Sequence, residues 1–210
     1  MDEYGLCLAD SRKVDVAVVF HVQTGTKVSE IERSLKPFLK NLFRYADIDG
    51  GNVRVSLTYF RKNPTLMFNL QKHRTRAAYS QAVDKITRKV RGKRNDAGAA
   101  LREVRTTVFD ESRGDRSDVP NAVILITDNK ANINPRRLQS EAAALKSAGI
   151  KLVTVGVGKA DRGELRSAAS DPAVENSFYF STYNSLRNDA SAAAVRSRIY
   201  ACKLPRWIQC

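Results

Sequence analysis

The run Val16–Phe20 constrains the fold of this chain more than any other stretch. It holds five consecutive apolar residues, four of them β-branched or aromatic. A strand without a polar face is buried on both sides, which is typical of a largely parallel sheet covered by helices. Thr24 and Thr26 follow directly, and then Ser29 and Glu32 form a capping-box pattern that begins a helix. Ligands of open α/β sheets bind beyond the carboxyl ends of the strands, so both threonine hydroxyls are predicted to lie at a ligand-binding rim.

Amphipathic helices are predicted along much of the remaining chain. Apolar stripes at helical spacing indicate helices at residues 30–44, 75–91, 97–109, 135–149 and 185–200. Pro37 predicts a bend in the first helix, because proline removes a backbone hydrogen bond. At 210 residues the chain suffices for one well-buried domain. We therefore divide it into an N-terminal segment (1–13), one α/β domain (14–201) and a C-terminal tail (202–210).

The order of these segments resembles the von Willebrand factor type A domain over residues 14–200. Residues 52–60 and 65–70 are similar to the family's second strand and its short antiparallel third strand. Residues 122–128 are similar to the fourth strand with its terminal aspartate, and residues 145–158 to the next helix, turn and fifth strand. The resemblance implies a doubly wound α/β fold of the extracellular-matrix kind. Its sheet would be mostly parallel and six-stranded, with one antiparallel edge strand and helices on both faces.

The resemblance also implies a metal-ion-dependent adhesion site, of which this sequence keeps only a part. In the family the first strand ends in Asp-x-Ser-x-Ser, and Thr24 and Thr26 match the two serines. Asp128 matches the aspartate that ends the fourth strand. Val22, however, stands where the first aspartate belongs, and Asn95 stands where a second loop carries a threonine. The sequence therefore predicts a degenerate metal site.

Losing the first carboxylate weakens such a site considerably. Magnesium requires a near-octahedral set of oxygen ligands, and removing a unit charge from beside the ion costs on the order of a few kcal/mol. We therefore expect the domain to need no metal cofactor. The alternative is a weakly held divalent cation: Asp96 could complete the site for an ion such as Mg²⁺, or His21 could make room for a softer ion.

A basic cluster leads into the second metal-site loop. It consists of Arg88, Lys89, Arg91, Lys93 and Arg94. The predicted fold places it at the rim, with Lys27 and residues 74–76 as neighbours. One interpretation is a solvated helix end, where cations favourably meet the helix dipole. The other is a polyanion-binding site, because arginine forks pair with sulfate and carboxylate groups. The net charge of +14 favours attraction to polyanions without saying which.

The three cysteines lie outside the predicted core. Cys7 precedes the first strand, and Cys202 and Cys210 follow the last helix. In many extracellular members of the resembled family, cysteines at the first two of these places pair, which implies a Cys7–Cys202 disulfide. Cys210 would then be available for an intermolecular disulfide. Three unpaired thiols are the alternative. An oxidised pair would favour an extracellular protein, because disulfides seldom persist in the cytosol.

Two further features bear on location and partners. Arg113, Gly114 and Asp115 form the tripeptide that many integrins recognise, although such tripeptides also occur by chance in turns. No run of about 18 or more apolar residues is present, so we expect no membrane span.

Three classes of function follow from these patterns. Catalysis is not expected, because no Gly-x-Ser-x-Gly or Walker pattern appears and neither rim threonine has a predicted base beside it. A basic nucleic-acid-binding domain is the alternative, motivated by charge alone, since no recognised nucleic-acid motif is present. The resemblance implies instead a secreted, non-catalytic module of the extracellular matrix. It would bind a collagen-like matrix protein or an acidic, sulfated polysaccharide through the rim, largely without metal.

Overall fold

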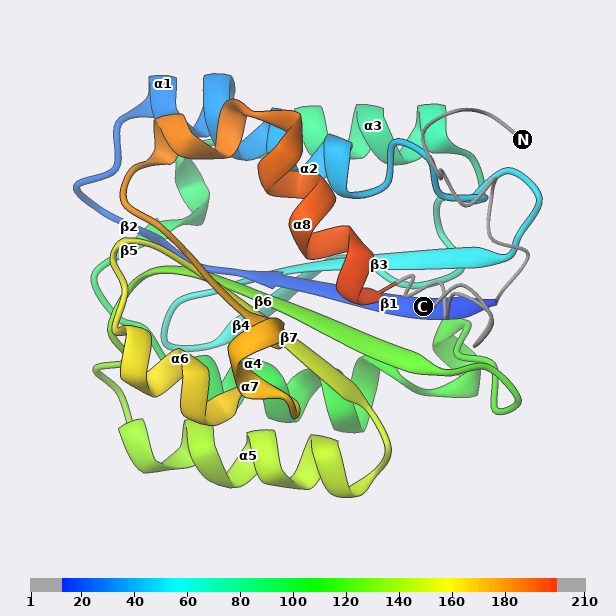
Figure 1. Cartoon of the computed structure of the whole chain (residues 1–210). Coiled ribbons are helices and arrows are strands. Elements are labelled where there is room, and N and C mark those ends of the chain that lie inside the picture. The colour runs from blue at the N-terminus through cyan, green and yellow to red at the C-terminus, as the bar shows by residue number, and fades with distance from the viewer. Residues whose placement is uncertain (1–12, 200–210) are drawn as a thin grey trace, which may run out of the picture.

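The structure, a computed structural model, describes residues 13–199, apart from the side chain of Arg88. A six-stranded sheet in the order β4-β3-β1-β6-β7-β8 forms its centre (Figure 1). The strands are β1 (Val14–Phe20), β3 (Val53–Phe60), β4 (Pro64–Phe68), β6 (Asn121–Asn129), β7 (Lys151–Lys159) and β8 (Ser177–Phe180). Every pairing is parallel except that of the edge strand β4 with β3. The predicted fold class is confirmed.

Strand β1 is buried along its whole length, as its sequence predicted. All seven of its residues are buried, and Val16 pairs with Val55 of β3 on one side and with Ala122 of β6 on the other. Val16, Val18 and Phe20 face one hydrophobic core, whereas Ala17 and Val19 face a second core on the opposite side of the sheet. An apolar run without a polar face therefore fits between two layers of helices.

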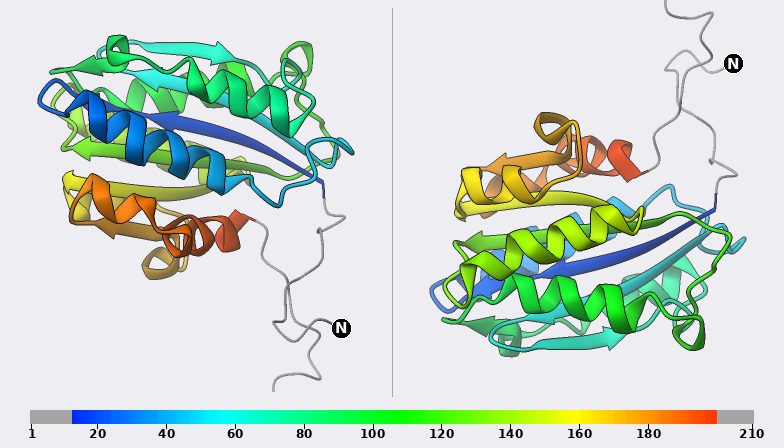
Figure 2. Two further views of the ribbon diagram at one scale, coloured as in Figure 1. Left: turned by 90° about the horizontal axis from the view of Figure 1, so that it is seen from above. Right: turned by 90° about the horizontal axis from the view of Figure 1, so that it is seen from below.

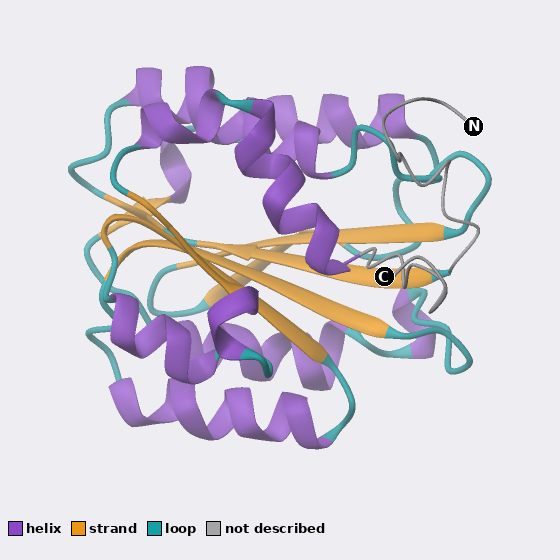
Figure 3. Ribbon diagram, in the orientation of Figure 1, coloured by secondary structure: helices purple, strands orange, loops and turns teal. Residues whose placement is uncertain are grey.

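Helices cover both faces of the sheet (Figures 1 and 3). One face carries α1 (Val28–Glu30), α2 (Lys36–Leu42), α3 (Arg76–Asp84) and α8 (Asp189–Ile199), and the other carries α4 (Ala97–Glu103), α5 (Pro135–Ser147) and α6 (Arg162–Ala168). The short helix α7 (Ala173–Asn176) precedes β8. Figure 2 shows α2 and α3 lying side by side along the sheet. No helix within residues 13–199 is both long and apolar enough to cross a bilayer.

The first helix begins differently from its prediction. Lys27 is the N-cap, and its backbone N–H donates to the Glu30 carboxylate at 2.7 Å. The predicted capping box of Ser29 and Glu32 is therefore wrong; Glu32 instead pairs with Lys36 at 2.8 Å, one turn further on. A π-helical turn (Ile31–Leu35) separates α1 from α2. The break in the regular helix thus lies directly before Pro37, whose missing N–H disturbs the ladder in this region.

The predicted helix 75–91 is wrong in its second half. Helix α3 ends at Asp84, and a 3₁₀ turn (Arg88–Val90) leads into the short strand β5 (Arg91–Gly92). Strand β5 pairs in parallel with β2 (Val22–Gln23), which follows β1. This pairing brings the 88–94 segment to the rim. The sixth strand of the sheet, which the sequence did not locate, is β8.

The three cysteines, Cys7, Cys202 and Cys210, lie outside the described residues.

Candidate functional site

The carboxylate of Asp128 lies at the centre of the rim. Asp128 is near the end of β6 and is 1% exposed. Its two oxygens accept from the Gln23 backbone N–H at 2.9 and 3.0 Å. Its Oδ2 also accepts from the hydroxyls of Thr26 and Tyr183, each at 2.7 Å, and His21 Nδ1 lies 3.3 Å from Oδ1. Protein donors therefore satisfy both oxygens of this buried charge.

Tyr183 is the member of this network that the sequence did not reveal. It begins a 3₁₀ turn (Tyr183–Arg187) that follows β8, 55 residues after its partner Asp128. Burial raises the pKa of the Tyr183 hydroxyl well above its usual value of 10.0, and the nearby Asp128 charge raises it further. The hydroxyl therefore stays protonated and donates at neutral pH. No local pattern marks such a residue, because only the fold brings it to Asp128.

The two rim threonines have different environments. Thr26 is buried against Asp128, whereas Thr24 is exposed. The guanidinium of Arg91 donates through Nη1 to the backbone oxygens of Thr26 and Thr24, at 2.8 and 3.3 Å. Val22 is 1% exposed and packs into the hydrophobic core. A basic side chain thus holds the loop that carries the threonines, and the position of the family's first aspartate is apolar.

The residues of the second metal-site loop, Asn95 and Asp96, also make internal contacts. The Asn95 amide donates to the Thr127 hydroxyl at 2.9 Å and to the Asn129 backbone oxygen at 3.0 Å. Asp96 caps α4 by accepting from the Ala99 backbone N–H at 2.9 Å, and it pairs with Arg137 at 3.2 Å. Neither residue contributes to the hydrogen bonds around Asp128, and Asp96 has a structural role at the start of α4.

These residues do not fit a divalent cation. A metal site needs oxygen ligands with free lone pairs, but Asp128 already accepts from Gln23, Thr26 and Tyr183. The ring of His21 also lies beside the carboxylate, with Nδ1 3.3 Å from Asp128 Oδ1. Within residues 13–199, no three His, Cys, Asp or Glu side chains are grouped as metal ligands.

The same contacts bear on catalysis. Thr26 and His21 both bond to Asp128 rather than to each other, and His21 Nε2 lies 3.2 Å from the backbone oxygen of Arg94. A nucleophile needs both a base within hydrogen-bond reach and access to substrate; the Asp128 carboxylate lies 2.7 Å from the Thr26 hydroxyl, but Thr26 is only 3% exposed. The contacts of His21 connect Asp128 to the basic segment.

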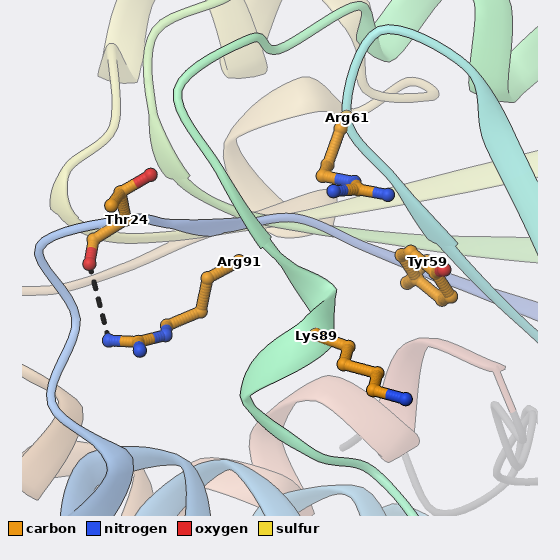
Figure 4. Close-up of a pocket in the computed structure, with 5 residues that line it drawn as sticks. All are labelled: Thr24, Tyr59, Arg61, Lys89 and Arg91. Carbon is orange, nitrogen blue, oxygen red and sulfur yellow. Dashed lines mark hydrogen bonds between the residues drawn. The ribbon is translucent and has the colours of Figure 1, made fainter.

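The basic cluster lies beside this network, as expected. Lys89 and Arg91 line an open hollow of about 560 Å³ together with Thr24, Tyr59 and Arg61 (Figure 4). In Figure 4 the Arg91 side chain extends toward Thr24, whereas Lys89 and Arg61 extend in the opposite direction. The interpretation of residues 88–94 as a helix end is wrong, because the segment is a 3₁₀ turn followed by β5.

A second open hollow, of about 420 Å³, adjoins the first. Its lining consists of Arg61, Lys62, Asn63, Thr65, Gly92, Lys93 and Arg94. Arg61 and Lys62 lie in the turn between β3 and β4 and were missed from the sequence. A signal was present, because β3 runs parallel to β1 and the residues after Phe60 must therefore lie at the same rim.

Other candidate residues lie elsewhere. Residues 74–76 are at the opposite end of the sheet, where the Arg76 backbone N–H donates to Asp49 in the turn before β3. Their expected place beside the cluster is wrong because α3 runs along the sheet and begins at its far end. Lys27, by contrast, follows Thr26 at the rim and is exposed.

The integrin-type tripeptide is also far from the rim. Residues 113–115 precede β6, at the amino ends of the parallel strands. Gly114 is buried with φ +95°, and its backbone oxygen accepts from Arg54 at 2.7 Å. Asp115 is half-buried, and burial raises the pKa of its carboxyl above the usual 3.8. The tripeptide therefore forms a packed turn.

The fold is of the doubly wound α/β type, and its rim carries a hydrogen-bonded network around Asp128. The family model of the von Willebrand factor type A domain matches residues 15–192, and the chain belongs to that family. It is 29% identical over 183 residues to human matrilin-3 and 30% identical to mouse matrilin-3, each match covering 85% of this chain and 36% of the relative. The chain thus spans little more than a third of the curated relatives it matches. These relatives place it with the extracellular-matrix members of the family.

Solved structures share the same fold. Proximal thread matrix protein 1 from the mussel byssus superposes with a TM-score of 0.81 at 22% identity, covering 91% of this chain and 48% of that chain. Another structure of the mussel protein, described with a zinc-occupied MIDAS motif, gives 0.79 at 24% identity over 92% and 47%. Manganese-loaded TRAP from Plasmodium vivax gives 0.71 at 17% identity over 92% and 75%.

Proposed function

We propose that this domain is a secreted, non-catalytic adhesion module of the extracellular matrix that binds its ligand through the rim without a bound metal. The ligand would be a collagen-like matrix protein or an acidic polysaccharide. Membership of the matrix-type family supports the adhesive role. The proposal of metal independence is based mainly on the hydrogen bonds of the Asp128 carboxylate, whose oxygens accept from Gln23, Thr26 and Tyr183.

The charge around Asp128 supports the same proposal. Where a relative with an intact site has a cation that bridges protein and ligand, this rim has Arg91, which is hydrogen-bonded to the threonine loop, and Lys89 beside it. Side-chain cations attract an acidic ligand directly, and arginine adds paired, directional hydrogen bonds. The role of the metal in attracting an anion would thus pass to basic side chains.

Two measurements test metal independence. Calorimetric titration of the domain with Mg²⁺, and then with Mn²⁺, should give no saturable heat near millimolar concentration. Binding to immobilised collagen and to heparin should be equal in EDTA and in Mg²⁺. Saturable metal binding, or a ligand that dissociates in EDTA and returns with Mg²⁺, would contradict the proposal. A relative with all the family's metal-site residues, assayed in parallel, should lose its ligand in EDTA and so validates the assay.

The nucleic-acid alternative rests on the net charge of +14. Single strands usually bind by stacking bases on aromatic side chains. Among the described residues that line the two hollows, the one aromatic side chain is that of Tyr59. Tyr59 is half-buried and packs against Phe20. These contacts favour a matrix ligand over a nucleic acid.

A further inference from the structure

The two hollows at the rim form one continuous basic surface. They share Arg61, and β5 contributes to both, Arg91 to the first and Gly92 to the second. We name this surface the basic groove and define it by six cations: Arg61, Lys62, Lys89, Arg91, Lys93 and Arg94. One wall is the β3–β4 turn and the other is the 89–94 segment. We propose that the basic groove binds a linear sulfated polysaccharide, with the sugar chain lying along both hollows.

The cations of the groove are free to meet an anion. Among the ion pairs of the described residues, none involves any of the six. The described residues that line the two hollows include no acidic side chain. Of the six, Arg61, Lys62, Lys89, Lys93 and Arg94 are exposed. Six cations without counter-charges repel one another, and a ligand with several anions relieves that repulsion.

Arg91 differs from the other five because it is partly fixed. Its Nη1 donates to the oxygens of Thr24 and Thr26, and its Nε is buried without a hydrogen-bond partner among the described residues. Held in this way, its guanidinium loses little further side-chain entropy when an anion binds. Gly92 has a related role, because a Cβ there would lie 2.5 Å from Arg61 Cδ. The absence of that Cβ lets Arg61 lie over β5 and join the two hollows.

The shape and chemistry favour a sulfated polysaccharide. The hollows are open and adjoin each other, with Lys89 and Arg91 lining the first and Lys93 and Arg94 the second. Cations spread over two adjoining hollows suit anions that repeat along a chain better than one isolated phosphate. Arginine forks match the paired oxygens of sulfate. This inference rests on the proposed function for its extracellular setting, in which such polysaccharides rather than nucleic acids are the linear polyanions.

Calorimetry with a heparin octasaccharide tests the proposal on the intact domain. The test variants are Arg61→Ser/Lys62→Ser and Lys93→Ser/Arg94→Ser, one for each wall. Lys72→Ser/Arg74→Ser is the matched control, because it removes the same charge from exposed side chains at the opposite end of the sheet. Lys89 and Arg91 are left intact, since Arg91 holds the threonine loop. Equal thermal unfolding midpoints establish that the variants are folded.

Each test variant should bind the octasaccharide about tenfold more weakly, as expected for the loss of one or two charge-assisted contacts. The control should change affinity less than about twofold. Arg61→Lys, which keeps the charge but not the fork, should give an intermediate loss. An equal loss in control and test variants would show general charge attraction and overturn the proposal, and so would no binding by the unaltered domain.

Single-stranded DNA of equal charge serves as the competing polyanion. It should bind more weakly than the octasaccharide at the same salt concentration. Tighter binding of DNA with the same dependence on the two walls would assign the groove to nucleic acid instead. If heparin fails while collagen still binds in EDTA, the inference about the groove fails alone and the proposed function stands; if collagen binding requires Mg²⁺, the proposed function fails.

Discussion

The chemistry of the rim depends on how one carboxylate is satisfied. A buried charge needs either an ion or several hydrogen-bond donors. Asp128 has donors from two parts of the chain, Gln23 and Thr26 after β1 and Tyr183 after β8, and the His21 ring lies beside it. In the proposed function these donors take the place of a metal, so that no coordination position is offered to a ligand and recognition comes from neighbouring side chains.

Tyr183→Phe tests the importance of this network for stability. The change removes a 2.7 Å hydrogen bond to Asp128 and leaves a lone pair of a buried carboxylate unsatisfied. Hydrogen bonds to charged groups contribute about 1.5–3 kcal/mol, so we expect the free energy of unfolding to fall by that amount. Urea denaturation measures it. Tyr45→Phe, an exposed tyrosine, is the control and should change stability by less than about 0.5 kcal/mol. Equal values for both would show that the network is not stabilising.

At the scale of elements, the sequence predicted those parts that local patterns determine. The apolar run of β1 required a buried strand, and the stripe at 97–109 required a helix, which continues as a π-helical turn (Val104–Val108) after α4. The helix prediction was wrong for the 88–94 segment, because this segment pairs with β2, which is remote in sequence. Tertiary pairing overrode a helical pattern that continued through Val90, which is buried in either conformation.

The same distinction applies to the site. Thr26 and Asp128 could be found because each directly follows or ends a predicted strand, and Arg91 because it belongs to a dense run of cations. Tyr183 could not, since its role depends on the path of the chain after β8. Arg61 lies between these cases: its position after β3 was predictable, but its contact with β5 at Gly92 depends on three-dimensional packing.

The contact between α4 and α5 provides a test at this scale. A Cβ on Gly98 would lie 2.7 Å from the backbone carbonyl carbon of Arg137, too close for any side-chain rotation to relieve. Gly98→Ala should therefore push α5 away from α4 and cost about 1–3 kcal/mol, as overpacking does. Thermal and urea unfolding measure the loss. Gly25→Ala is the control, because a Cβ there would have no heavy atom within 4 Å outside its chain neighbours, so no strain is expected. A stability equal to that of the unaltered domain would show that the two helices adjust freely.

At the scale of the whole molecule, the rim and the described chain ends lie at opposite ends of the sheet. Strand β1 begins at the amino end, and α8 returns there, since its Arg198 pairs with Glu175. Arg198 also lies near Lys151, at the start of β7: burial lowers the pKa of Lys151, and the charge of Arg198 lowers it further. Figure 1 shows both described ends on the side away from β2 and β5. The basic groove therefore lies at the end of the sheet away from residues 13 and 199.

This arrangement makes the Cys7–Cys202 disulfide a testable prediction. From residues 13 and 199, the chain reaches about 20 Å and 10 Å respectively to these cysteines, and both segments start from the same end of the sheet. Closing so long a loop restricts the unfolded chain by about 5 kcal/mol in the entropy model, an upper figure. Non-reducing peptide mapping should recover the Cys7–Cys202 pair, and reductant should lower the thermal midpoint. Cys210→Ser should keep that midpoint and abolish disulfide-linked dimers, whereas Cys7→Ser should reproduce the effect of reductant. Recovery of Cys7 as a free thiol would refute the pairing and remove the structural reason for placing the domain in an oxidising compartment.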